Sequence, residues 1–110
     1  MKTKLLLAAL VAMAVSSPVS AAYVIGSADC GQWVNRNGGK IPPTWEGLIT
    51  ERWLTGFLSG LNQGDSQNRN SLKKVSAEQI FLWMDNYCKA NPLKNVAYGA
   101  EDLMDELRKK

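Results

Sequence analysis

The stretch TWEGLITERWLTGFLSGLN, residues 44–62, decides the fold class of this chain. Large apolar residues recur every four positions along it, which is the spacing of one face of an α-helix. They are Trp45, Ile49, Trp53, Phe57 and Leu61, with Leu48, Leu54 and Leu58 beside them. Thr44 precedes the run in the position of an N-cap. We therefore predict an amphipathic helix from Thr44 to about Asn62.

Two glycines, Gly56 and Gly60, lie four residues apart within this predicted helix. A glycine in a helix interior costs roughly 1 kcal/mol relative to alanine, so a compensating contact is expected. We predict that another helix packs closely against the backbone at the small notch that the two glycines leave.

Three more segments have helical patterns, and none has the alternation of a convincing β-strand. A short helix is predicted near residues 28–35, with Ser27 or Asp29 as its N-cap. A third helix opens with the capping box SAEQ at 76–79 and ends near residues 90–92. A last helix is predicted with Asn91 as cap and Pro92 at its first position. Its expected inward residues are Leu93, Val96, Ala97, Ala100, Leu103, Met104 and Leu107.

The segment QGDSQNRNS, residues 63–71, contains no apolar residue and is predicted to be a mobile polar loop. Such a loop is either a tolerated insertion or a binding loop, and both readings stay open. The sequence as a whole predicts a small all-α bundle of three to four helices.

The N-terminus has the three regions of a secretory signal peptide. Lys2 and Lys4 give it a positive start, residues 5–15 are apolar, and small residues follow Pro18. Cleavage is expected after Ala21 or Ala22, which divides the chain into a signal at 1–22 and a single helical domain at 23–110. The apolar run is about half of the roughly 20 residues that a membrane anchor needs. We therefore expect a periplasmic or secreted protein with no stable membrane insertion after cleavage.

Loss of Lys2 and Lys4 with the signal lowers the number of basic residues from 13 to 11, against 10 acidic ones. The remaining basic stretches are short and carry no interleaved aromatics. Nucleic-acid binding is therefore not expected.

Cys30 and Cys88 are the two cysteines of the chain. Because the expected destination is oxidising, a disulfide between them is predicted. Closing this loop would remove unfolded-chain entropy worth roughly 4 kcal/mol, a large share of the stability of a small domain.

The chain has no histidine. This removes the Ser/His/Asp and Cys/His nucleophile schemes together with the commonest metal ligand and general base. Carboxylates such as Glu46 and Asp85 lie on amphipathic helices, where a solvated face is a better explanation than a catalytic pair. We expect no enzymatic activity, no catalytic residues, no metal site and no cofactor.

Aromatic residues at helical spacing are most often core residues. The stripe in residues 44–62 is nevertheless broad, and any part left exposed would form a patch suited to a partner or a homodimer. The candidate partner-binding residues are Trp45, Trp53, Phe57 and Trp83. The expected partners are proteins, either unfolded clients or one enzyme.

Several short motifs occur in a familiar order: Cys30, then WLTGFLSGLN at 53–62, then IFLWMDNYC at 80–88, then Pro92-Leu93 and a charged terminal helix. This outline resembles the HdeA/HdeB-like group of small periplasmic helical proteins. The resemblance implies an acid stress chaperone, or holdase, that is a folded dimer at neutral pH and loosens in acid to hold unfolding clients.

The same outline is similar to periplasmic immunity proteins that neutralise peptidoglycan amidases of type VI secretion. That resemblance implies the alternative function, an inhibitor of a cell-wall-degrading enzyme. The spacing from Cys30 to Cys88 is longer than in the best-known chaperones, and residues 63–71 account for much of the excess. A loop of this kind suits insertion into an enzyme cleft better than it suits a holdase.

Overall fold

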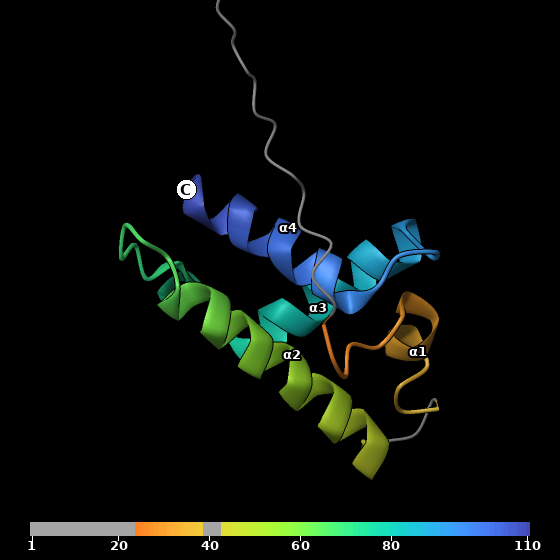
Figure 1. Ribbon diagram of the computed structural model, residues 1–110. Coiled ribbons are helices and arrows are strands. Elements are labelled where there is room, and N and C mark those ends of the chain that lie inside the picture. Colours follow the sequence, from red (N-terminus) through yellow and green to blue (C-terminus); the bar gives the residue numbers. More distant parts are fainter. Residues whose placement is uncertain (1–23, 39–42) are drawn as a thin grey trace, which may run out of the picture.

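The computed structural model describes residues 24–38 and 43–110, and all of its regular structure over these ranges is helical (Figure 1). The elements are α1 (Cys30–Val34), α2 (Trp45–Gln63), the 3-10 helix η1 (Ser71–Lys74), α3 (Ala77–Ala90) and α4 (Val96–Arg108). An isolated antiparallel bridge joins Asp29 to Asn95. The predicted all-α class is confirmed. The expected signal segment, with Ala21 and Ala22, lies outside the described residues.

Three of the predicted helix starts are confirmed by their caps. The Asp29 side chain accepts a hydrogen bond from the Gln32 backbone N–H at 2.7 Å, which completes a capping box at α1. Thr44 accepts from the Gly47 N–H at 3.0 Å at the start of α2. Ser76 forms the predicted capping box with Gln79 at α3. Each cap satisfies a backbone N–H that the first turn of a helix leaves without a partner.

The start of the last helix differs from the prediction. Its cap is Asn95, whose side chain accepts from the Tyr98 N–H at 3.1 Å. Residues 91–94 form a turn instead, closed by a hydrogen bond from the Lys94 N–H to the Asn91 carbonyl. Leu93 therefore does not face the core and is 98% exposed. The other predicted inward residues of this helix are buried.

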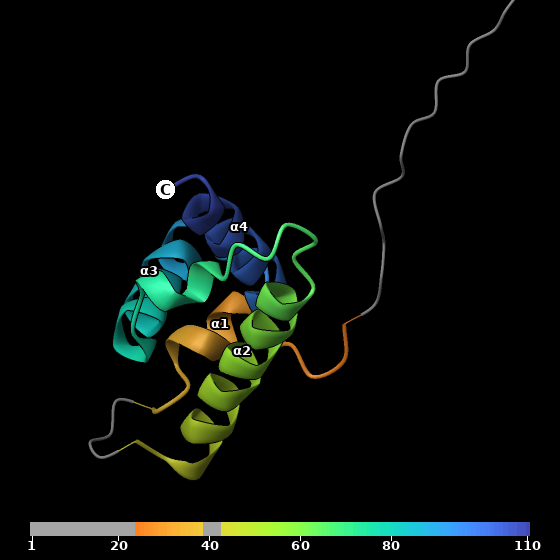
Figure 2. The ribbon, with the colours of Figure 1, turned by 90° about the vertical axis from the view of Figure 1, so that its left-hand side faces the viewer.

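Helix α4 is the central element of the bundle. It packs against α2, against α3 and against η1, whereas α1 packs against α3. Figures 1 and 2 show α2 and α4 running in the same general direction, with α1 near their N-terminal ends. The core lies between these elements. Its fully buried larger side chains are Trp33, Leu54, Leu58, Met84, Val96 and Met104.

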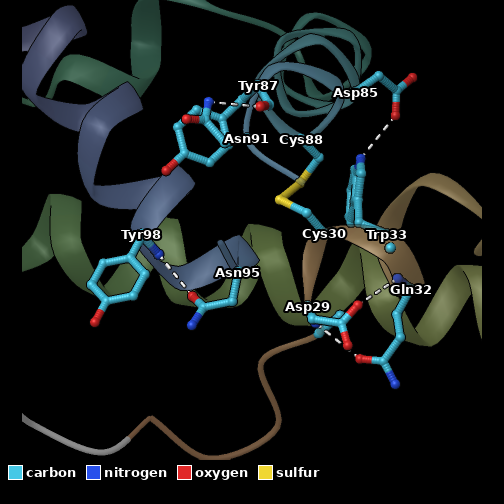
Figure 3. The surroundings of a disulfide bond; sticks show 12 residues. Asp29, Cys30, Gln32, Trp33, Asp85, Tyr87, Cys88, Asn91, Asn95 and Tyr98 are labelled. Carbon is cyan, nitrogen blue, oxygen red and sulfur yellow. Dashed lines mark hydrogen bonds between the residues drawn. A yellow bond between two sulfur atoms is a disulfide. The ribbon is translucent and has the colours of Figure 1, made fainter. Parts of the chain in front are cut away.

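The predicted Cys30–Cys88 disulfide is present and joins the first residue of α1 to the last turn of α3 (Figure 3). Both cysteines are buried, at 0% and 1% exposure. Two backbone hydrogen bonds of 2.9 Å hold the same region from the other side, from Cys30 N–H to the Lys94 carbonyl and from Val96 N–H to the Ala28 carbonyl. The segment before α1 is thereby joined to the start of α4.

The prediction that Gly56 and Gly60 receive a neighbouring helix is wrong. Both glycines are exposed, and a Cβ atom added at either would meet nothing within 4 Å. The close helix approach occurs at Gly99 of α4, where an added Cβ would lie 2.6 Å from Met84 Sδ and 2.9 Å from the Tyr87 ring. The glycine that allows α3 and α4 to pack closely is therefore Gly99, and not either glycine of the predicted Gly56/Gly60 notch.

Candidate protein-binding surface

The apolar residues of α2 surround the helix, and only part of them faces the core. Leu54 and Leu58 are fully buried, whereas Trp45 is 71% and Ile49 is 52% exposed. At 100° per residue, Gly56 lies about 180° from the direction midway between Leu54 and Leu58. We call the aromatic band the four side chains Trp45, Ile49, Trp53 and Phe57. They run along α2 from near the middle of the outer face, on which Gly56 lies, to its edge at Phe57.

The inner half of the aromatic band is held in place by the domain. Trp53 and Phe57 are half-buried and stack with their ring centroids 5.0 Å apart. The Trp53 indole N–H donates to the Ile25 carbonyl at 2.9 Å. Gly26 has φ +85° and packs on the Trp53 indole, so a side chain there would collide with the ring. The band thus ends in two positioned aromatic rings and begins in two exposed apolar side chains.

A bridge of charged side chains ties α2 to α1 and α3. The Arg36 guanidinium donates to Glu51 of α2 at 2.9 Å and to Asp85 of α3 at 2.8 Å. It also lies over the Trp33 ring, 4.1 Å from the centroid. Asp85 accepts a second hydrogen bond, from the Trp33 indole N–H at 2.8 Å (Figure 3). Arg36 and both carboxylates are largely shielded from water, which strengthens hydrogen bonds between charged groups.

Of the predicted polar loop at residues 63–71, Gln63 ends α2 and Ser71 begins η1, and the segment between them has a buried anchor that its composition did not suggest. Asp65 is 7% exposed and receives two hydrogen bonds from Arg69, at 2.8 and 3.0 Å, and one from the Gln67 N–H. These hydrogen bonds hold the pKa of the Asp65 carboxyl far below its usual range, and the bond from the Arg69 side chain contributes most to this shift. Arg108 of α4 lies 3.8 Å from the same carboxylate. The loop is therefore fastened to the end of the bundle.

The exposed side of this loop carries amide side chains. Asn68 and Asn70 both have φ +52°, the left-handed conformation that asparagine tolerates. The Asn62 amide donates to the Asn70 side chain and its oxygen accepts from the Leu72 N–H. The loop starts where α2 ends, so it lies at the end of α2 opposite to the exposed Trp45.

Trp83, the fourth candidate partner-binding residue, belongs to a different contact. It stacks on Tyr87 of the same helix, with centroids 5.3 Å apart, and its indole N–H donates to Glu106 of α4 at 3.3 Å. The Tyr87 hydroxyl is buried without a hydrogen-bond partner in the described structure, and burial, aided by the nearby Asp102, raises the pKa of this phenol. The structure therefore brings together Trp45, Trp53 and Phe57 but not Trp83.

Within residues 24–38 and 43–110, no three His, Cys, Asp or Glu side chains are grouped so that they could hold a metal ion. In the same ranges no helix has the length and hydropathy that a membrane span requires. A buried disulfide is typical of proteins in an oxidising compartment outside the cytosol.

Comparison of the chain with protein-family models, with curated proteins and with solved structures finds no match. Its function must therefore be argued from the surfaces described above.

Proposed function

We propose that this is a non-enzymatic binding protein of the periplasm, and that the aromatic band of α2 docks a protein partner. The observation that carries the proposal is the exposure of Trp45 and Ile49 on a helix whose opposite face is already buried in the core. Tryptophan is one of the residues enriched in binding hot spots, where few side chains supply most of the affinity. Glu46 and Arg52 are the only charged residues of the exposed face of α2, so a partner can cover it without burying many charges.

The anchored loop favours one folded partner over many unfolded clients. A surface that is already ordered loses little conformational entropy on binding, which gives affinity for one complementary shape. The Asp65 anchor fixes the backbone of residues 63–71, and the disulfide fixes α1 against α3. These features support the immunity or inhibitor function, with a cell-wall-degrading enzyme as the partner class.

The test compares two exposed apolar side chains on different helices. The chain without residues 1–22 is used to capture envelope proteins at pH 7, and each captured protein is then titrated by calorimetry. Trp45→Ala should weaken the complex at least about tenfold, the effect of losing an interface tryptophan. Leu82→Ala removes a side chain of α3 that is 61% exposed and serves as the matched control. If the two variants bind equally, α2 is not the docking face. Loss of wall hydrolysis by the captured enzyme on binding would establish inhibition.

A second function, the acid holdase, is favoured by the Arg36 bridge. The disulfide joins α1 to α3, but α2 is held to them through the ion pair with Glu51. Strong acid protonates carboxylates and leaves the arginine charge uncompensated. Because α2 also packs on α4, exposure of Leu54 and Leu58 requires that α2 separate from α4 as well. These side chains and the aromatic band would then form a surface suited to unfolding clients.

The holdase proposal is tested by light scattering of an aggregating client at pH 2–3, with and without the protein. Suppression at stoichiometric amounts supports it, and no suppression rules it out. Capture at pH 7 and pH 3 separates the two functions, because one tight partner at pH 7 supports the inhibitor and many clients at pH 3 support the holdase.

A further inference from the structure

We infer that a hollow beside the aromatic band receives a basic side chain, arginine or lysine, of the protein partner. The inference rests on the proposed docking function and adds the chemistry that the partner must present. The hollow has a volume of about 510 Å³ and lies between the segment before α1, α1 itself and the first two turns of α2. Gly26, Ser27, Gln32, Arg36, Glu46 and Thr50 form its walls.

The two charged residues that line the hollow, Arg36 and Glu46, are compensated to different extents. Arg36 is already compensated by two carboxylates, Glu51 at 2.9 Å and Asp85 at 2.8 Å. Glu46 adds a further negative charge at the wall and forms no ion pair with any described residue. A cation entering this open hollow therefore meets a carboxylate that has no ion-pair partner among the described residues.

Glu46 is not compensated by a basic residue of its own helix either. Arg52 is exposed and lies about 120° around the helix from Glu46 at 100° per residue. Neutral acceptors complete the wall. Asn35 and Thr50 both line the hollow, and the Thr50 oxygen can still accept hydrogen bonds while its proton goes to the Glu46 carbonyl at 2.9 Å.

The hollow and the aromatic band share a wall, which argues for a protein side chain as the occupant. Thr50 and Glu46 line the hollow, and Ile49 and Trp45 precede them directly on the band. At the other end, Gly26 lines the hollow and packs on the Trp53 indole. A free amine would leave the exposed Trp45 and Ile49 in water, whereas a protein that covers the band can place a basic side chain in the adjacent hollow.

The test uses a small probe, so that it does not depend on finding the partner. N-acetyl-arginine amide, which carries one positive charge, is titrated into the ¹⁵N-labelled chain without residues 1–22. Its neutral citrulline counterpart is the probe control, because it keeps the shape and loses the charge. We expect saturable NMR shifts at the residues that line the hollow, with binding about tenfold tighter for the arginine probe than for the citrulline probe.

Glu46→Gln should remove this preference, while Glu101→Gln, on the exposed side of α4, should retain it. Shifts that do not saturate, that are equal for the two probes, or that persist unchanged in Glu46→Gln overturn the inference. Should Glu46→Gln lose stability, the comparison of the two probes on the unmodified protein still decides. If the arginine probe does not bind but Trp45→Ala still weakens partner binding, only the inference of a basic side chain is refuted. If the probe binds but Trp45→Ala has no effect on partner binding, the proposed docking face is refuted.

Discussion

Replacing Gly56 and Gly99 by alanine should change stability in opposite directions. Alanine is favoured over glycine in a helix interior by roughly 1 kcal/mol, and this gain is common to both sites. At Gly56 the new methyl group meets nothing within 4 Å, so Gly56→Ala should stabilise the protein by up to about 1 kcal/mol.

At Gly99 the new methyl group would lie 2.6 Å from Met84 Sδ and 2.9 Å from both Met84 Cε and the Tyr87 ring. Met84 is fully buried and Tyr87 is stacked on Trp83, so neither side chain has free space to enter. Overpacking of this kind costs about 1–3 kcal/mol, which cancels or exceeds the gain in helix propensity. Gly99→Ala should therefore leave stability unchanged at best and lower it by up to about 2 kcal/mol.

The assay is urea unfolding at pH 7 with the disulfide intact, followed by tryptophan fluorescence and by circular dichroism. Coincident transitions establish two-state unfolding, and the midpoints then rank the variants. The expected order is Gly56→Ala above the unmodified protein, with Gly99→Ala at or below it. A destabilising Gly56→Ala, or a Gly99→Ala as stabilising as Gly56→Ala, would refute the assignment of the close approach to α4.

Four further predictions follow from the packing and the charges. Cys88→Ser should lower the free energy of unfolding by roughly 4 kcal/mol, and an unchanged melting temperature would contradict this. Leu58→Ala opens a cavity in the core and should lower the free energy of unfolding by about 2–5 kcal/mol. Ile49→Ala, at a half-exposed position, should lower it by less than about 1 kcal/mol. Equal urea midpoints for the two variants would show that the face of α2 with Leu58 is not the buried one. Because the pKa of Asp65 is lowered on folding, its contribution to stability is present at neutral pH and disappears as the pH falls below the usual aspartate range. Asp65→Asn should therefore flatten the loss of stability on acid titration, and an identical pH profile would exclude the anchor. Tyr87→Phe removes a buried hydroxyl without a partner, so melting should be unchanged or higher, and a clear loss would reveal a bond to that hydroxyl.

The helices were predictable because local chemistry decides them. Caps at Thr44 and Ser76 bond to backbone groups three residues away, so the local sequence contains both partners. The disulfide was predictable from two cysteines and an oxidising destination. The last helix was misplaced because Asn91-Pro92 and Asn95 are both good starts, and the bonds that choose Asn95 come from residues 28–30, distant in the sequence.

The orientation of α2 was not predictable from its own residues. Apolar side chains occupy most of its circumference, so periodicity alone does not say which of them the core receives. Leu54 and Leu58 are buried because α4 packs on their side of α2, and Gly56, on the opposite side of the helix, therefore faces outward. In the same way, the Asp65 anchor depends on Arg108 in addition to the neighbouring Arg69, and nothing in the polar stretch itself reveals a buried carboxylate.

The position of the cystine along the chain limits what it can protect. Residues 30–88 form a closed covalent ring that contains α2 and α3, whereas α4 follows the ring as an open branch. Since α4 covers the inner side of α2, detaching that branch uncovers Leu54 and Leu58 without breaking any bond between sulfur atoms. The oxidised protein can therefore lose its core while its ring stays closed.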